Sequence, residues 1–150
     1  MIKLPYNIVM QSVIESKIQE RVKTLREHHI PLTTTRLVLL RFLATNRGHY
    51  SAEDIYQILK EEYPSLSIAT VYNNMSLFAR LGIVQELRIE KDKIIYDTYT
   101  EPHAHFLCLK CGQIYDIDTS MKEFPEEIDG HAVHFVHTYY FGICKNCRQT

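Results

Sequence analysis

Ser67-Ile-Ala-Thr-Val-Tyr-Asn-Asn-Met-Ser-Leu-Phe-Ala-Arg-Leu-Gly82 is the stretch that decides the fold of the first half of the chain. Ser67 can cap a helix, apolar residues follow every three or four positions, and Gly82 is a typical stop signal. Two β-like runs come next, 83–89 and 93–99, joined by the charged turn Glu90-Lys91-Asp92. This order is typical of a winged helix-turn-helix, in which the quoted helix would be the recognition helix.

Three further amphipathic helices are predicted upstream of this stretch. The first has apolar residues at helical spacing up to Leu25 and ends before Pro31. The second begins after the hydroxyls of Thr33–Thr35, and the third begins at Ser51, which can form a capping box with Asp54. We therefore expect residues 1–88 to form a winged-helix DNA-binding domain.

Composition and charge suggest a soluble protein with two roles. The 150 residues are 45% hydrophobic and 23% charged, which is ordinary for a globular protein. Residues 1–81 carry ten Lys/Arg and seven Asp/Glu, whereas residues 82–150 carry seven and eleven. A basic front half and an acidic back half favour two separate tasks. No secretory signal or membrane-spanning run is recognisable, so we expect a cytoplasmic protein with no membrane partner.

Two Cys-x-x-Cys pairs predict a structural Zn²⁺ site. They contain all four cysteines of the chain, Cys108, Cys111, Cys144 and Cys147. A two-residue spacer lets both thiolates of a pair reach one tetrahedral ion, and cytoplasmic thiols stay reduced. Redox dithiols or disulfides are the alternative. The ion would hold a last strand, predicted over 132–141, against a hairpin predicted over 103–109 and 113–117.

A second cluster of metal-binding residue types lies beside the first cysteine pair. His103 and His105 are two apart on a predicted strand and share a face, whereas Cys108 has the opposite parity. If the cysteine turn closes a symmetric antiparallel hairpin, Asp116 falls opposite His105. A His/carboxylate cluster without thiolates suits Mn²⁺ or Fe²⁺, although each histidine could instead be a surface or core imidazole.

The rest of the chain completes an α+β prediction. Residues 89–101 would form the wing end and hinge, and residues 102–150 a small α/β dimerisation domain with the zinc knuckle. A short acidic helix is expected over 119–127. The three histidines near the last strand have mostly structural roles in this interpretation: His131, His134 and His137.

In combination, these motifs resemble the ferric uptake regulator family over roughly residues 20–148. The resemblance rests on 32–36, 49–56, 67–75, 103–112 and 141–147. Asn73-Asn74, Asp116 and Ala104, the residue between the two histidines, are similar to the family's peroxide-responsive branch. The final-strand histidines depart from the family's register. The resemblance implies a metal-dependent repressor that binds a two-fold symmetric double-stranded DNA operator as a homodimer.

The resemblance also implies which residues act. The regulatory Fe²⁺ or Mn²⁺ would be held by five residues: His49, Asp97, His103, His105 and Asp116. Peroxide reacting at bound Fe²⁺ would oxidise ligand histidines, namely His49 and His103. On the DNA side, we expect phosphate contacts from Arg36 and Thr70 and base contacts from Tyr72, Asn73 and Asn74.

Three alternatives remain open on the sequence. The first is an iron- or zinc-responsive repressor of the same family. The second is a non-haem iron metalloenzyme, because two histidines and a carboxylate can form an oxygenase site. The third is a zinc-binding interaction module with no DNA role. We do not expect an enzyme, since no motif suggests a substrate pocket and an enzyme would leave the helix-turn-helix pattern unexplained.

Overall fold

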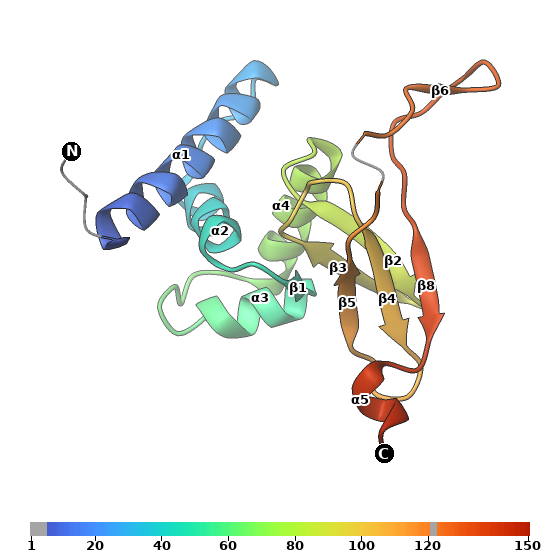
Figure 1. Cartoon of the computed structure of the whole chain (residues 1–150). Coiled ribbons are helices and arrows are strands. Elements are labelled where there is room, and N and C mark those ends of the chain that lie inside the picture. Colours follow the sequence, from blue (N-terminus) through green and yellow to red (C-terminus); the bar gives the residue numbers. More distant parts are fainter. Residues whose placement is uncertain (1–5, 121–122) are drawn as a thin grey trace. The chain divides into compact units, whose positions relative to one another are not determined.

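The computed structural model describes residues 6–120 and 123–150 (Figure 1). The chain divides into two compact units. The first unit runs up to Glu86 and also includes Ile95–Thr100. The second consists of Leu87–Ile94 and Glu101–Thr150. No helix among the described residues is both long enough and apolar enough to cross a membrane.

Four helices build the first unit, and all four are those predicted from the sequence. Ser67 caps the last of them, and Ser51 and Asp54 form the predicted capping box, with backbone-to-side-chain bonds of 2.8 and 3.1 Å. A positive φ of 72° at Gly82 follows the last helix and suits glycine. The helices are α1 (Tyr6–Glu27), α2 (Thr34–Thr45), α3 (Ala52–Leu59) and α4 (Ile68–Arg80).

The core of the first unit is formed by the apolar faces of these helices. Leu25 of α1, Leu39 of α2 and Ile55 of α3 are fully buried. On α4, Val71 and Phe78 are also fully buried. Because one face of α4 is packed in this core, the opposite face is left to contact solvent or a partner.

The wing is a three-stranded sheet in the order β1-β3-β2. β2 (Gln85–Glu90) and β3 (Lys93–Asp97) are the predicted hairpin, with Asp92 in the turn at a φ of 60°. The short strand β1 (His49–Tyr50) was not predicted, because two residues are too few to show a strand pattern. Its antiparallel pairing sets His49 opposite Asp97.

The second unit contains a three-stranded sheet in the order β5-β4-β8. β4 (Ala104–Cys108) pairs antiparallel with β5 (Ile114–Ile117) and parallel with β8 (Tyr139–Gly142). The register sets His105 opposite Asp116, which confirms the opposition predicted from a symmetric hairpin. A short helix, α5 (Lys145–Arg148), follows β8.

Two predictions for this unit are wrong. The short helix predicted over 119–127 is absent from the described residues of that range, which leave out 121–122. The reason is Pro125, which has no N–H to donate within a helix and disfavours a helical conformation in the residue before it. Instead, β6 (Glu127–Ile128) pairs with β7 (His131–Ala132). The strand predicted over 132–141 is interrupted at 133–138, because β4 is short and offers a partner only from Tyr139 onward.

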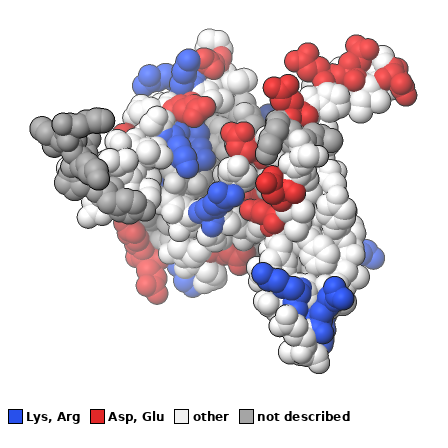
Figure 2. Space-filling model, viewed as in Figure 1, with Lys and Arg blue, Asp and Glu red and all other residues white. Residues whose placement is uncertain are grey.

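Charge is unevenly distributed over the second unit. Figure 2 shows Asp and Glu side chains gathered over the β6–β7 hairpin, which includes Glu127 and Asp129. Lys and Arg side chains gather around α5, which begins with Lys145 and ends with Arg148. In this view the second unit therefore carries an acidic patch on the β6–β7 hairpin and a basic patch around α5.

Candidate metal centres and nucleic-acid interface

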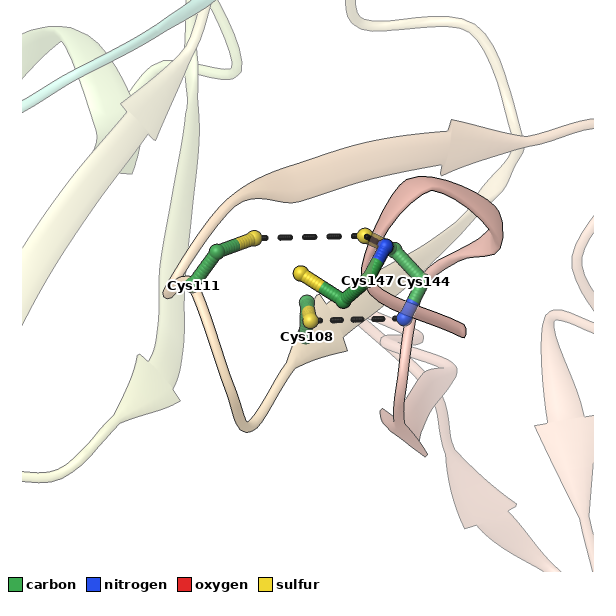
Figure 3. A group of neighbouring side chains, drawn as sticks. All are labelled: Cys108, Cys111, Cys144 and Cys147. Atoms are coloured by element: carbon green, nitrogen blue, oxygen red, sulfur yellow. Dashed lines mark hydrogen bonds between the residues drawn. The ribbon is translucent and has the colours of Figure 1, made fainter. Parts of the chain in front are cut away.

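The four cysteines meet at one end of the sheet in the second unit (Figure 3). Cys108 ends β4 and Cys111 lies in the turn to β5, whereas Cys144 caps α5 and Cys147 lies within it. All four sulfur atoms lie within 4.8 Å of one another. The Cys111 and Cys144 Sγ atoms are 3.9 Å apart. A zinc tetrahedron with Zn–S bonds of about 2.3 Å has edges of about 3.8 Å, so the thiols fit such an ion.

Backbone N–H groups favour the thiolate form of two of these cysteines. The Cys144 N–H donates to Cys108 Sγ at 3.3 Å, and this bond is the main reason why the pKa of Cys108 is lowered to about 6. The Cys147 N–H donates to Cys144 Sγ at 3.4 Å. The pKa of Cys147 itself is raised to about 12, chiefly because its thiol donates to Cys144. A cation that takes the place of this proton would satisfy all the sulfurs together.

Tyr115 of β5 also supports the cysteine cluster, and we did not predict it from the sequence. Its phenol hydrogen bond to Cys144 is the main reason why the pKa of Cys144 is lowered. The same bond raises the pKa of Tyr115 to about 12. No local pattern could have revealed this contact, because the two residues are brought together only when β8 and α5 join the sheet.

A group of nitrogen and oxygen donors lies on β4, on β5 and at the residue just before β4, in the same unit. Asp116 Oδ1 is 3.2 Å from His103 Nε2 and 3.7 Å from His105 Nε2. The two imidazole rings are 4.4 Å apart and buried, whereas the Asp116 side chain is 31% exposed. Neighbouring ligands of an octahedral ion, at bonds of about 2.1 Å, lie about 3 Å apart, so this group could hold a cation.

A backbone carbonyl orients one of these imidazoles. His103 Nδ1 lies 2.6 Å from the carbonyl oxygen of Glu101. A carbonyl only accepts, so this contact favours the tautomer in which Nδ1 carries the proton and donates it. The Nε2 lone pair then faces Asp116, which is the arrangement of many metal-bound histidines.

In the first unit, the wing sheet carries another two potential metal ligands, one imidazole and one carboxylate. His49 Nε2 lies 3.6 Å from Asp97 Oδ2, and Asp97 is fully buried. Asp97 Oδ1 accepts a hydrogen bond from the Tyr99 N–H at 2.9 Å. Gly48 and Thr98 exchange two further bonds of 3.0 and 3.1 Å, which fix the segments that carry the pair. A positive partner, such as a protonated imidazole or a metal ion, would stabilise this buried carboxylate further.

The histidines near the last strand lie outside both sets of donors. His131, His134 and His137 are exposed. The ring of His137 stacks on Tyr139, with centroids 5.8 Å apart. Among the described residues, none of the three belongs to a cluster of potential metal ligands.

The predicted DNA-contacting residues lie on α4 and at the start of α2. Tyr72 is 45% exposed and Asn73 is exposed, whereas Thr70 and Asn74 are half-buried. The Thr70 hydroxyl is 2.7 Å from that of the cap residue, Ser67. The structure joins two of the predicted contacts to each other, because Arg36 Nε donates to Asn74 Oδ1 at 3.0 Å.

A winged helix joined to a unit with two kinds of potential metal ligand defines the class of metal-responsive DNA-binding regulators. The comparison with known families agrees with this class. The sequence profile of the ferric uptake regulator family matches residues 27–149. The chain belongs to the ferric uptake regulator family.

Individual relatives point to the peroxide-responsive branch. The peroxide-responsive repressor PerR of Staphylococcus aureus strain Mu50 is 34% identical over 139 residues, which are 90% of this chain and 94% of the relative. A structure of PerR from Streptococcus pyogenes is 32% identical, with a TM-score of 0.52, and the match covers 87% and 92% of the two chains. The fold is also similar to that of the ferric uptake regulator Fur of Helicobacter pylori, with a TM-score of 0.71. That match is 20% identical and covers 91% of this chain and 95% of the Fur chain.

These findings confirm several predictions from the sequence. The predicted family and its peroxide-responsive branch are confirmed. The predicted α+β fold class, a winged helix-turn-helix domain followed by a dimerisation domain, is confirmed as well. The function that the family and its relatives support is that of a metal-dependent, peroxide-sensing repressor.

Proposed function

We propose that this chain binds operator DNA as a homodimer while a regulatory metal ion is bound, and that peroxide ends the binding by oxidising a metal ligand. The observation that carries the proposal is the coexistence of two different donor sets in one small unit. Four thiols fit a permanent zinc ion, whereas His103, His105 and Asp116 offer the nitrogen and oxygen donors that Fe²⁺ and Mn²⁺ prefer.

The four cysteines would hold Zn²⁺ as a structural ion. The support is the separation of 3.9 Å between two sulfurs and the N–H groups that donate to Cys108 and Cys144. These donors offset part of the negative charge that the thiolates place on the ion. With all four positions filled by protein, no open site is left for chemistry.

The regulatory ion would take ligands from both units of the chain. We assign to it the donor pair of the first unit and the donor group of the second: His49, Asp97, His103, His105 and Asp116. An ion bound by all five stabilises one orientation of the two units over all others. In a homodimer, that orientation sets the spacing of two α4 helices, so metal binding raises the affinity for a two-fold symmetric operator.

The response to peroxide would depend on which metal is bound. Bound iron would supply a redox-active centre that can activate peroxide beside the ligand imidazoles. We assign the oxidation to His49 and His103, as expected from the family resemblance. An imidazole that gains an oxygen atom is a poorer ligand. The buried ring of His103, fixed by Glu101, has little room to adjust, so the orientation that suits DNA would be lost.

The proposal is tested by electrophoretic mobility with a duplex that the purified protein enriches from a randomised pool. We expect tight binding with Mn²⁺ or Fe²⁺, release of the Fe²⁺ form by peroxide, and no release of the Mn²⁺ form. Mass spectrometry should find one added oxygen atom on a peptide with His49 or His103. Oxidation confined to cysteine peptides would refute the sensing mechanism. If peroxide leaves the metal-dependent binding to DNA unchanged, an iron- or zinc-responsive repressor is favoured instead.

A further inference from the structure

Both the oxygen and the nitrogen of the Asn74 side-chain amide make hydrogen bonds within the first unit. Its Oδ1 accepts a hydrogen bond from Arg36 Nε at 3.0 Å, and its Nδ2 donates to the Thr70 carbonyl oxygen at 2.9 Å. The orientation of the amide follows from chemistry, because a guanidinium can only donate and a carbonyl can only accept. The amide therefore links α2 to α4.

These two internal hydrogen bonds compete with recognition of a DNA base by Asn74. Asparagine reads adenine through two bonds, one from its oxygen and one from its nitrogen. Its two internal bonds leave one lone pair and one N–H unused, but they hold the amide in one orientation. To turn toward a base edge, Asn74 would have to break those bonds. Asn73, the preceding residue on α4, is exposed, and its side chain makes no hydrogen bond to any of the described residues. Of the two asparagines, Asn73 is the one whose amide is available.

The same contacts fix the guanidinium of Arg36. Besides Nε, which donates to Asn74, its Nη1 donates to the Pro31 carbonyl oxygen at 2.6 Å. Two contacts on a planar group determine its orientation. Within the described part of the chain, Nη2 makes no hydrogen bond and keeps its N–H groups for an outside acceptor. A DNA phosphate is such an acceptor, and arginine binds phosphate through paired N–H groups.

We infer that Asn74 is a positioning residue that holds the Arg36 guanidinium for a phosphate contact, while Asn73 supplies the base-edge contact. This inference rests on the proposed function, since both roles need duplex DNA. It divides the predicted DNA-contacting residues into two classes, with different effects on sequence specificity.

A double-mutant cycle tests the inference. The probes are a duplex that the wild-type protein enriches from a randomised pool with Mn²⁺ and a scrambled duplex of equal length. We expect Asn74→Ala to weaken binding to both duplexes by a similar factor, about three- to tenfold, and to add nothing when Arg36→Ala is already present. Asn73→Ala should weaken binding to the enriched duplex alone, by about five- to 100-fold.

Two further readouts separate positioning from a loss of folding. The slope of log affinity against log salt should fall by about one for Arg36→Ala, fall in part for Asn74→Ala, and stay unchanged for Asn73→Ala. Asn74→Asp keeps the acceptor for Arg36 and loses the amide donor that adenine needs. It should therefore keep the ratio of affinities for the two duplexes, even though its added charge weakens both.

Specific outcomes would overturn the inference. If Asn74→Ala and Asn74→Asp lose discrimination as Asn73→Ala does, and this loss persists in the Arg36→Ala background, then Asn74 reads bases. If the wild-type protein enriches no duplex at all, the proposed function fails and the inference falls with it. If the wild-type protein enriches a duplex while Asn74→Ala binds both probes normally, only the inference fails.

Discussion

Loss of zinc should unfold the second unit and leave the first one folded. Structural zinc sites bind their ion with about 10–16 kcal/mol, whereas a whole domain is typically stable by about 5–15 kcal/mol. The second unit has few buried apolar side chains besides its cysteines, among them Leu87, Leu107 and Ile114. The first unit is held by the packed faces of α1–α4. Without the ion, the second unit therefore has too little burial to offset its loss of chain entropy.

Cys147→Ser is the perturbation that tests this expectation with the least change in packing. Cys147 lies in α5 and is only half-buried, so its loss removes little packing and a large effect would come through the metal. Asn146→Ser, at an exposed position in the same helix, is the matched control. We expect the first variant to lose zinc and the second to keep one zinc per chain.

Hydrogen exchange measured by mass spectrometry locates the effect. In Cys147→Ser, peptides covering β4, β5 and β8 should exchange as in an unfolded chain, while peptides covering α2 and α4 keep their protection. The zinc content is measured on the same samples. If the β4 and β5 peptides stay protected after complete loss of zinc, the second unit is stable by its own packing and the reasoning is refuted.

Three more predictions concern the core, the regulatory site and pH. Phe78→Ala should lower the free energy of unfolding of the first unit by about 3–5 kcal/mol, because Phe78 is fully buried. Tyr72→Ala, on the exposed face of α4, should change that free energy by less than about 0.5 kcal/mol and should weaken DNA binding instead. Urea unfolding and mobility shift measure the two effects, and equal destabilisation would contradict the packing described for α4. Asp116→Asn should weaken Mn²⁺ binding and leave zinc in place, as metal analysis would show; loss of zinc would mean that the two donor sets are not independent. Because the pKa of Cys108 is lowered from 9.0 to about 6, its thiolate stabilises the fold above the ordinary thiol pKa, and this contribution is lost as pH falls toward 6. Protons compete with zinc in the same direction, so chelator competition should show weaker zinc binding at pH 5 than at pH 7, and a constant affinity would count against thiolate ligation.

Several features of this protein were predictable because neighbouring residues determine them. Ser51 and Ser67 mark helix starts through bonds to backbone groups three residues away. The opposition of His105 and Asp116 follows from strand parity and a symmetric turn at the cysteines. The spacing within each cysteine pair likewise indicates a shared metal without knowledge of the fold.

Other features were decided only by the tertiary structure, because they join segments far apart in the chain. Arg36 and Asn74 are separated by 38 positions, and no periodicity predicts that one guanidinium will meet that amide. Tyr115 reaches Cys144 only after β8 and α5 have joined the sheet. The last strand is shorter than its pattern because a strand needs a partner and β4 is short. Local spacing thus determined which residues could act, and long-range packing determined which of them were already engaged with each other.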